Sequence, residues 1–333
     1  MTTRDAASDW WPSASLDTLK ASAELRRTIR QWMKHSSILE VSTPPLSWAA
    51  NTDPQVQSIT VDAAAGSVRG RYLHTSPEFA MKRLLCAYPT TDIYQLATVF
   101  RAEEQGRFHA SQFDMLEWYR VGMTHTDLMD DVAGLLRHVW AGFAIDFPAI
   151  QIISYCEAVF NRLGNWPDEL HGNTIRDYFL QHGRSFPAGL ENDHSASLDL
   201  FVDEFLVAEF PDTVITFLTD YPASQAALAR IAINNAGVMV AQRFEVFAGR
   251  IELANGFHEL ADASVQRQRF ELDLHNRSVI GQSPVPIDEH LLAALSHGLP
   301  DCSGVALGLD RLHMVLGAHD HINEVKSFCD DNA

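Results

Sequence analysis

The sequence has few basic residues for its length, and this shortage restricts the partners that the protein can have. Its 333 residues include 25 Lys and Arg against 43 Asp and Glu, a formal net charge of −18 with histidine neutral. A large nucleic-acid interface normally needs a basic face that displaces counterions from the phosphates. The charge balance therefore argues against an extended interface with RNA or DNA, and tRNA binding is not expected.

Clustered cysteines and glycine-rich nucleotide motifs are also missing. The four cysteines, Cys86, Cys156, Cys302 and Cys329, are far apart and form no CxxC pair. This spacing predicts neither a zinc site nor a disulfide framework. The sequence contains no GxxxxGK[ST] and no GxGxxG, so it supports neither a P-loop nor a Rossmann site.

Long apolar runs are absent as well. No stretch approaches the roughly 20 apolar residues of a membrane span, and residues 1–15 lack the basic and apolar regions of a signal peptide. We therefore expect a cytoplasmic protein without a membrane partner. With 46% hydrophobic and 20% charged residues the composition is that of a globular enzyme. We expect a disordered tail over 1–13 and a single catalytic domain over 14–330.

The order of the expected elements favours an α+β fold. Apolar spacing predicts a helix over 16–34, and two antiparallel hairpins are indicated over 98–120 and 242–256. Such hairpins favour an antiparallel sheet flanked by helices over a parallel α/β arrangement. Breaks rich in Gly, Pro and His predict a helical insertion around 150–215.

The stretch FRAEEQGRFHASQFDMLEWYR, residues 100–120, is the most informative part of the chain. Because side chains alternate between the faces of a strand, Arg101 and Glu103 share one face, and Phe113 and Tyr119 share a face of the partner strand. A charged strand face is usually solvated, but the two aromatic residues would be poor choices for open solvent. A lined pocket is therefore the better interpretation.

The second hairpin carries carboxylates among apolar neighbours. Glu245, Glu252 and Glu259 lie in or beside strands rich in Val, Phe and Leu. A carboxylate in such surroundings needs a cation, a metal or a ligand amine. Glu245 and Glu252 suit Mg²⁺, which usually binds one or two carboxylates together with substrate phosphates. The alternative is ordinary ion pairing with Arg243 or Arg250.

The direction of Asn255 is left open by the sequence. Strict alternation would place Glu252 and Asn255 on opposite faces of the strand. Gly256 could mark a bulge or a strand end that redirects Asn255.

The third informative segment, residues 303–311, is a run of small residues that leads into a helix predicted over about 310–318. Glycines let a ligand lie close to the backbone, and a helix N-terminus that carries Arg311 can face phosphates. A tightly packed strand–helix corner with a surface arginine is an equally good interpretation of this segment alone.

Together these segments resemble the class II aminoacyl-tRNA synthetases. Residues 38–45, 100–119 and 304–311 are similar to the three signature motifs of that family, and TSPE at 75–78 with ELANGFHEL at 252–260 is similar to the amino-acid pocket of its lysyl branch. The resemblance spans about residues 16–328.

One domain of the lysyl-tRNA synthetases is not expected here. Those enzymes carry an anticodon-binding domain ahead of the first motif, whereas 37 residues precede residue 38 in this chain. The chain is therefore more similar to the free-standing paralogues that attach lysine or β-lysine to a lysine of elongation factor P. The sequence does not distinguish α-lysine from (R)-β-lysine.

The resemblance implies an antiparallel catalytic sheet, a homodimer, ATP with Mg²⁺, and an aminoacyl-adenylate. It also implies a role for each matching residue. For ATP these are Arg101, Ala102, Glu103, Ala110, Phe113, Glu245, Val246, Gly304, Gly308 and Arg311. For the amino acid they are Ser76, Pro77, Glu78, Glu117, Tyr119, Glu252, Asn255 and Glu259. Catalysis is assigned to Arg101, Glu245, Glu252 and Arg311, with Glu245 and Glu252 as metal ligands.

The same resemblance assigns specific contacts. Arg101 would touch the α-phosphate and the amino-acid carboxylate, and Phe113 would stack on adenine against Arg311. The amino groups near the reacting carboxylate would meet Ser76, Glu78 and Glu117. The distal ammonium would meet Tyr119 and Glu259, and Asn255 would assist the carboxylate.

The loop of the second motif departs from the family. In the family this loop commonly reads His-Asn-Pro-Glu-Phe, whereas this chain has His109-Ala110-Ser111-Gln112-Phe113. Two alternatives stay open, and only the first of them rests on this departure. One is a catalytically silent regulatory paralogue, and the other is a ligase that charges tRNA or a small molecule.

Overall fold

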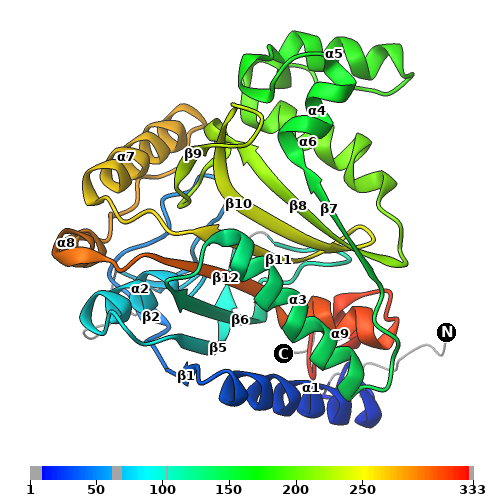
Figure 1. Cartoon of the computed structure of the whole chain (residues 1–333), viewed down its shortest axis with the longest axis vertical. Helices are drawn as coiled ribbons and strands as arrows, with labels where there is room; N and C mark the ends of the chain where they lie inside the picture. The colour runs from blue at the N-terminus through cyan, green and yellow to red at the C-terminus, as the bar shows by residue number, and fades with distance from the viewer. Residues whose placement is uncertain (1–9, 62–69, 103, 330–333) are drawn as a thin grey trace. The chain divides into compact units, whose positions relative to one another are not determined.

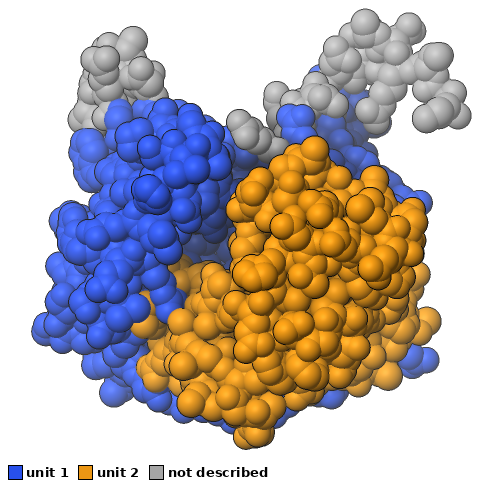
Figure 2. Space-filling model, turned by 90° about the horizontal axis from the view of Figure 1, so that it is seen from above, with its two compact units in different colours: residues 1–147, 261–333 blue, residues 148–260 orange. Residues whose placement is uncertain are grey.

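The computed structural model describes residues 10–61, 70–102 and 104–329. The chain forms two compact units, which Figure 2 colours separately. Unit 1 comprises Met1–Phe147 and Ala261–Ala333, and unit 2 comprises Pro148–Leu260. The α+β prediction is confirmed, since both units combine helices with mainly antiparallel strands (Figure 1).

The main strands of unit 1 lie in the order β1-β5-β6-β12. β1 (Leu39–Glu40) is parallel to β5 (Ile93–Phe100), whereas β6 (Gln112–Val121) is antiparallel to both β5 and β12 (Cys302–Gly308). The predicted hairpin is therefore confirmed. Its first strand ends at Phe100, so Arg101 and Ala102 follow the strand.

Short strands and helices complete unit 1. A second sheet has the order β2-β4-β3, formed by Leu46–Ser47, Arg71–Leu73 and Thr60–Val61. The α-helices are α1 (Leu16–His35), α2 (Glu78–Ala87), α3 (His125–Gly142), α7 (Ala263–Val279), α8 (Glu289–Gly298) and α9 (Leu309–Gly317). A 3₁₀ turn, η6, covers Ile322–Glu324.

Local chemistry sets where these helices begin. The Ser15 hydroxyl accepts the Thr18 N–H at α1, and Thr124 forms a capping box with Asp127 at α3. At α2 the N-cap position is Pro77, which offers no side-chain cap. The Ser76 hydroxyl instead accepts the Glu78 N–H at 3.4 Å.

Asp273 on α7 makes the stability of the protein dependent on pH. Burial, together with the charge of Asp53, raises the pKa of Asp273 to about 6, although Thr52 donates a hydrogen bond of 2.8 Å to it. The folded state therefore holds a proton that the unfolded chain releases at lower pH. The free energy of unfolding falls as pH rises from about 4 to about 6, and the whole loss is present above pH 6.

We expect Asp273→Asn to stabilise the protein at neutral pH. A pKa of about 6 in place of the ordinary value of an aspartate corresponds to about 3 kcal/mol, which partial exposure reduces to about 1–2 kcal/mol. Asparagine keeps an acceptor for Thr52 and removes the titration. Urea unfolding at pH values near 4 and above 7 checks this: the gain belongs at the higher pH, and equal gains at both would contradict it.

Unit 2 has its strands in the order β11-β10-β8-β7, with β9 also paired to β10. β7 (Ala149–Ser154) is parallel to β8 (Val214–Pro222), and the remaining pairs are antiparallel. β9 covers Ile231–Ile233, β10 Met239–Ala248 and β11 Ile251–His258. The hairpin predicted over 242–256 is confirmed, and its turn contains Gly249 with φ +56°.

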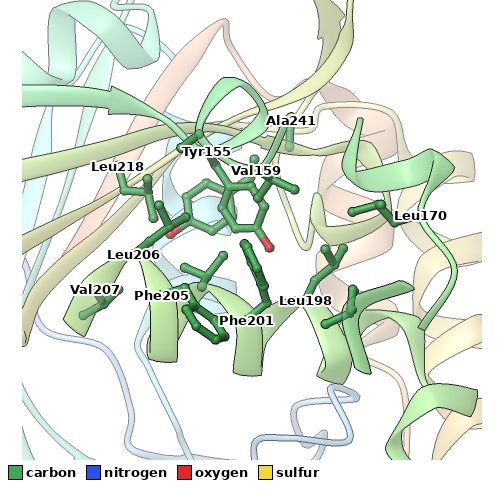
Figure 3. Packing of buried hydrophobic residues seen from close by; sticks show 14 of the residues in the cluster. Tyr155, Val159, Leu170, Leu198, Phe201, Phe205, Leu206, Val207, Leu218 and Ala241 are labelled. Carbon is green, nitrogen blue, oxygen red and sulfur yellow. The ribbon is translucent and has the colours of Figure 1, made fainter. Parts of the chain in front are cut away.

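The segment 150–215 is mainly helical and also contains most of β7. Its helices are α4 (Tyr155–Leu163), α5 (Gly172–Gln181) and α6 (His194–Phe205), with 3₁₀ turns η2 (Pro167–Glu169), η3 (Leu190–Asn192) and η4 (Val207–Glu209); η5 (Ala223–Gln225) follows β8. Figure 3 shows Tyr155, Val159 and Phe201 close together in the buried cluster that joins these helices to β8 and β10. This cluster is the core of unit 2.

The predicted disordered tail lies partly outside the described residues, which begin at position 10. Within them, the Ser13 N–H donates to the Ser327 carbonyl at 2.8 Å, and the Ser13 hydroxyl accepts the Cys329 N–H at 3.0 Å. The four cysteines are free thiols. None of the helices over 10–61, 70–102 and 104–329 is long and apolar enough to cross a membrane.

Candidate functional site

One face of β6 carries the candidate residues of unit 1. Tyr119 lies opposite Ile93 of β5 and Gly304 of β12, and Glu117 lies opposite Gln95 and Ala306. Alternation places Phe113 on the same face as Glu117 and Tyr119. The residues of β12 opposite the phenol and the acid, Gly304 and Ala306, are small, so the backbone of β12 is close to this face.

Arg101 extends this face beyond the end of β5. Its backbone N–H donates to the Ser111 carbonyl at 2.8 Å, and its guanidinium lies 5.1 Å from the centre of the Phe113 ring. Nη1 donates to Glu104 at 3.1 Å and Nε to the Thr75 carbonyl at 3.4 Å. The Arg101 side chain is 26% exposed, so a positive charge stands over the Phe113 ring and stays partly accessible.

Glu117 and Tyr119 form a buried polar pair. The Tyr119 hydroxyl donates to Glu117 Oε1 at 2.6 Å, and each residue is 2% exposed. A carboxylate at this depth is stable only with donors or a cation around it. The pair has the chemistry needed to receive an ammonium group.

Glu78 has a cationic partner that the sequence prediction missed. Lys82 Nζ lies 2.7 Å from Glu78 Oε1, and the lysine is 2% exposed. The sequence contained the signal for this pair, because Glu and Lys four residues apart meet on one helix face.

Ser76 and Pro77 line a cavity of about 390 Å³, which also touches Trp48 and Arg71. Arg101, Glu117 and Tyr119 are not among its lining residues.

The start of α9 is tied to the loop before β6. Arg311 Nε donates to the Phe108 carbonyl at 3.1 Å, and the Asp114 N–H donates to Asp310 at 3.1 Å. Burial raises the pKa of the Asp310 carboxyl. Gly308 ends β12 next to this corner. The arrangement joins the second and third motif segments.

The loop whose sequence departs from the family, residues 109–113, is anchored by a buried alanine. Ala110 is 4% exposed and packs with Met314, Ile322 and Val325. Its side chain is therefore part of a small core, so only its backbone could contact a nucleotide. The Ala102 N–H donates to the Gln57 carbonyl at 2.8 Å. Glu103 lies outside the described residues.

The hairpin of unit 2 contains a bulge that decides where Asn255 points. Asn255 lies opposite Glu245, whereas Glu252 lies opposite Phe247, and the register shifts between these two pairs. β11 therefore has one extra residue, Leu253, and Glu252 and Asn255 share a face with Glu245. The irregularity precedes the position that the sequence indicated.

Gly256 has a packing role. A Cβ atom at this position would lie 2.4 Å from the Phe244 ring, which is fully buried. We expect Gly256→Ala to lower the free energy of unfolding by about 1–3 kcal/mol through overpacking. Thermal and urea unfolding measure the loss. Adding Phe244→Leu should recover part of it, and a double variant as destabilised as the sum of the single variants would contradict the contact.

Glu245 is paired within its own strand. Arg243 Nη2 lies 2.5 Å from Glu245 Oε1, which is the ion pair considered as an alternative from the sequence. Burial raises the pKa of the Glu245 carboxyl, the positive charge of Arg243 opposes the rise, and the charge of Glu252 adds to it. Glu252 is thus near enough to act on Glu245, and a divalent cation would relieve their repulsion.

The other two residues of unit 2 that the sequence assigned to ligand binding, Val246 and Glu259, are both buried. Val246 is 0% exposed and points away from the Glu245 face, so its backbone alone could meet a ligand. Glu259 follows β11, is 1% exposed and pairs through its backbone with Ala229. From the sequence Arg243 was expected only as an ion-pair partner and not as a site residue, although its place two residues before Glu245 puts both on one face.

Mg²⁺ fits the donors that this hairpin supplies. Glu245 and Glu252 are hard oxygen ligands on one face, and Mg²⁺ commonly takes one or two carboxylates with phosphate oxygens and water. In the described ranges no group of three or more His, Cys, Asp and Glu residues could hold a metal ion alone. The two carboxylates would therefore share the ion with a phosphate ligand.

The two hairpins and the small-residue strand that leads into Arg311 are the features by which this class of enzyme is recognised. The model of the class II tRNA synthetases (D, K and N) matches residues 5–332, and the chain belongs to this family.

Individual members of the family are similar to this chain over nearly its whole length. The chain is 42% identical over 324 residues to the elongation factor P–(R)-β-lysine ligase of Vibrio atlanticus (strain LGP32), which covers 96% of this chain and 98% of that protein. It is 43% identical, with the same coverage, to the enzyme of that name from Vibrio cholerae. For the one from Edwardsiella ictaluri the identity is 41% over 331 residues.

Proposed function

We propose that this chain is an ATP-dependent ligase that activates lysine or (R)-β-lysine and transfers it to a lysine side chain of elongation factor P. The observation that carries the proposal is the buried Glu117–Tyr119 pair on the face of the β5–β6 hairpin that Arg101 extends, in a chain similar over nearly its whole length to ligases of that name. The product is a post-translational modification of a translation factor. The alternatives of a silent paralogue and of a tRNA ligase have less support.

The first step joins the amino acid to AMP. The amino-acid carboxylate attacks the α-phosphorus of ATP, the bond to the β-phosphate oxygen breaks, and pyrophosphate leaves. Negative charge accumulates on the α-phosphate, which a positive guanidinium stabilises without a protein nucleophile. Arg101 supplies that charge, and Phe113 with Arg311 would hold the adenine. Mg²⁺ bound by Glu245 and Glu252 would neutralise phosphate charge.

The second step transfers the aminoacyl group. The neutral amine of the acceptor lysine attacks the carbonyl carbon of the adenylate, the bond to the phosphate oxygen breaks, and AMP leaves as the amine loses a proton. The amino acid carries two ammonium groups, and several acids suit it. Ser76, Glu78 and Glu117 would meet the amino group near the carboxylate, whereas Tyr119 and Glu259 would meet the distal one.

The other parts of the proposal concern the surroundings of the reaction. The nucleotide would also contact Ala102, Glu103, Val246, Gly304 and Gly308, largely through backbone atoms. The active form would be a cytoplasmic homodimer whose macromolecular partner is elongation factor P.

Two measurements test the proposal. ATP–pyrophosphate exchange should depend on added lysine or (R)-β-lysine. Incubation with elongation factor P should raise the mass of that protein by one aminoacyl group, on a lysine that peptide mapping identifies. Absence of exchange with both amino acids, together with an unchanged mass, would overturn the proposal. Exchange followed by transfer to tRNA would instead identify a tRNA ligase.

A further inference from the structure

Arg243 lies on the candidate face of unit 2, which is the face of β10 and β11 that carries Glu245, Glu252 and Asn255. Its guanidinium lies 4.4 Å from the centre of the Tyr221 ring and 5.7 Å from that of Phe257, and the side chain is 16% exposed. The rings come from β8 and β11, which flank β10 on either side. The arginine is therefore confined by both neighbouring strands.

Three nitrogen atoms of this guanidinium bond to three different groups. Nη2 donates to Glu245 Oε1 at 2.5 Å, Nε to Asn255 Oδ1 at 3.2 Å, and Nη1 to the backbone carbonyl of Gln225 at 3.0 Å. The first two acceptors are side chains that lie opposite each other on β10 and β11. One rigid fork thus fixes the positions of both.

The bond to Asn255 also selects the orientation of its amide. An asparagine side chain carries an acceptor oxygen and a donor NH₂ group on opposite branches. With Oδ1 directed at Arg243, the NH₂ group is the branch left to donate to a ligand carboxylate. The reverse orientation would present an oxygen to that carboxylate and repel it.

We propose that Arg243 is a positioning residue for amino-acid activation, which holds the Glu245 carboxylate toward the metal and the Asn255 NH₂ group toward the substrate carboxylate. The proposal rests on the function proposed above. Arg243 acts through these two side chains and makes no contact of its own with the reacting atoms. A planar fork is needed, because the single ammonium of a lysine cannot hold two acceptors in fixed directions.

Two substitutions separate the two tasks. Arg243→Met removes both bonds, and we expect KM for the amino acid and the Mg²⁺ concentration for half-maximal exchange each to rise by about 10–100-fold. Arg243→Lys keeps a positive charge for Glu245 but lacks the fork. It should leave the Mg²⁺ requirement within about threefold of the unchanged protein and still raise KM for the amino acid about tenfold.

The control is another arginine of the same hairpin. Arg250 is exposed and donates to the Ala208 carbonyl at 2.9 Å, so Arg250→Met makes the same chemical change outside the candidate face. Its KM values should equal those of the unchanged protein. Thermal unfolding of each variant gives the folded fraction. A purely structural role would lower the exchange rate in proportion to that fraction and leave both KM values unchanged.

The outcomes separate this proposal from the function on which it rests. If the unchanged protein shows no exchange with either amino acid, the proposed function fails. If it is active and both Arg243 variants keep its KM for the amino acid, the positioning role is refuted. Should Arg243→Met not fold, the lysine variant decides alone, because it retains the ion pair with Glu245. A raised KM supports the role, and an unchanged KM overturns it.

Discussion

Arg101→Met is expected to lower the rate of ATP–pyrophosphate exchange by about 10²–10³-fold, the effect of removing one preorganised group from a developing oxyanion. The guanidinium is held by Glu104 and by the Thr75 carbonyl, so its position is set before any ligand arrives. Methionine fills a similar volume beside Phe113 and removes the charge. Initial rates at saturating amino acid measure the loss.

Arg107→Met is the matched control for this prediction. Arg107 lies on the same loop, is 60% exposed and pairs with Asp320. Its replacement should change the exchange rate by less than about twofold, since exposed pairs contribute little. If the two variants lose equal activity, or if Arg101→Met retains more than half the rate, Arg101 does not stabilise the transition state.

Glu117→Gln is expected to raise KM for the amino acid by about 10–100-fold, as the loss of a buried charge partner does. KM for ATP should stay within about twofold, because the carboxylate is assigned to an amino group. Glutamine preserves the shape and can still accept from Tyr119. The variant should be at least as stable as the unchanged protein, because a buried charge is costly. Kinetics with each substrate varied in turn, together with thermal unfolding, check both parts.

An exposed glutamate provides the comparison. Glu271 lies on the outer surface of α7, and Glu271→Gln should alter neither KM value. Equal rises in both KM values for Glu117→Gln would show a general disturbance of the site. A lower melting temperature would show that the carboxylate stabilises the fold.

The faces of β6 could be predicted because they depend only on the two-residue period of a strand. Phe113, Glu117 and Tyr119 alternate with buried Leu116 and Trp118, and the register of β5 and β12 confirms the pattern. Patterns of this kind depend only on residues close together in the sequence, so the sequence alone is enough to predict them. The two antiparallel hairpins were predictable for the same reason.

Features that depend on the partner strand could not be predicted. Alternation in β11 fails at Leu253 because β10 has no residue opposite it. The sequence of one strand does not show how many residues of the partner strand will pair with it. The three bonds of Arg243 likewise join β10, β11 and η5. β7 was missed because it makes its hydrogen bonds with β8, which is distant in the chain, and β9 was missed because it has only three residues.

The departure at Ala110 acquires a physical explanation from the packing. An asparagine there would carry a polar amide into the cluster of Met314, Ile322 and Val325 and would need partners. Alanine fits this cluster without them. The loop is thus held by apolar contact and by the bond between Arg311 and the Phe108 carbonyl.

The extra residue in β11 has a consequence for how this chain tolerates change. The alternation of side chains between the two faces of β11 shifts by one residue at Leu253. Glu252 and Asn255 therefore lie on the same face although they are three residues apart. A regular strand of the same length would turn the Glu252 carboxylate away from the Asn255 amide, whereas deleting Leu253 would restore regular pairing and leave the two on one face at a spacing of two. The shared face of Glu252 and Asn255 therefore depends on the irregular pairing at Leu253 as well as on the identities of the two residues.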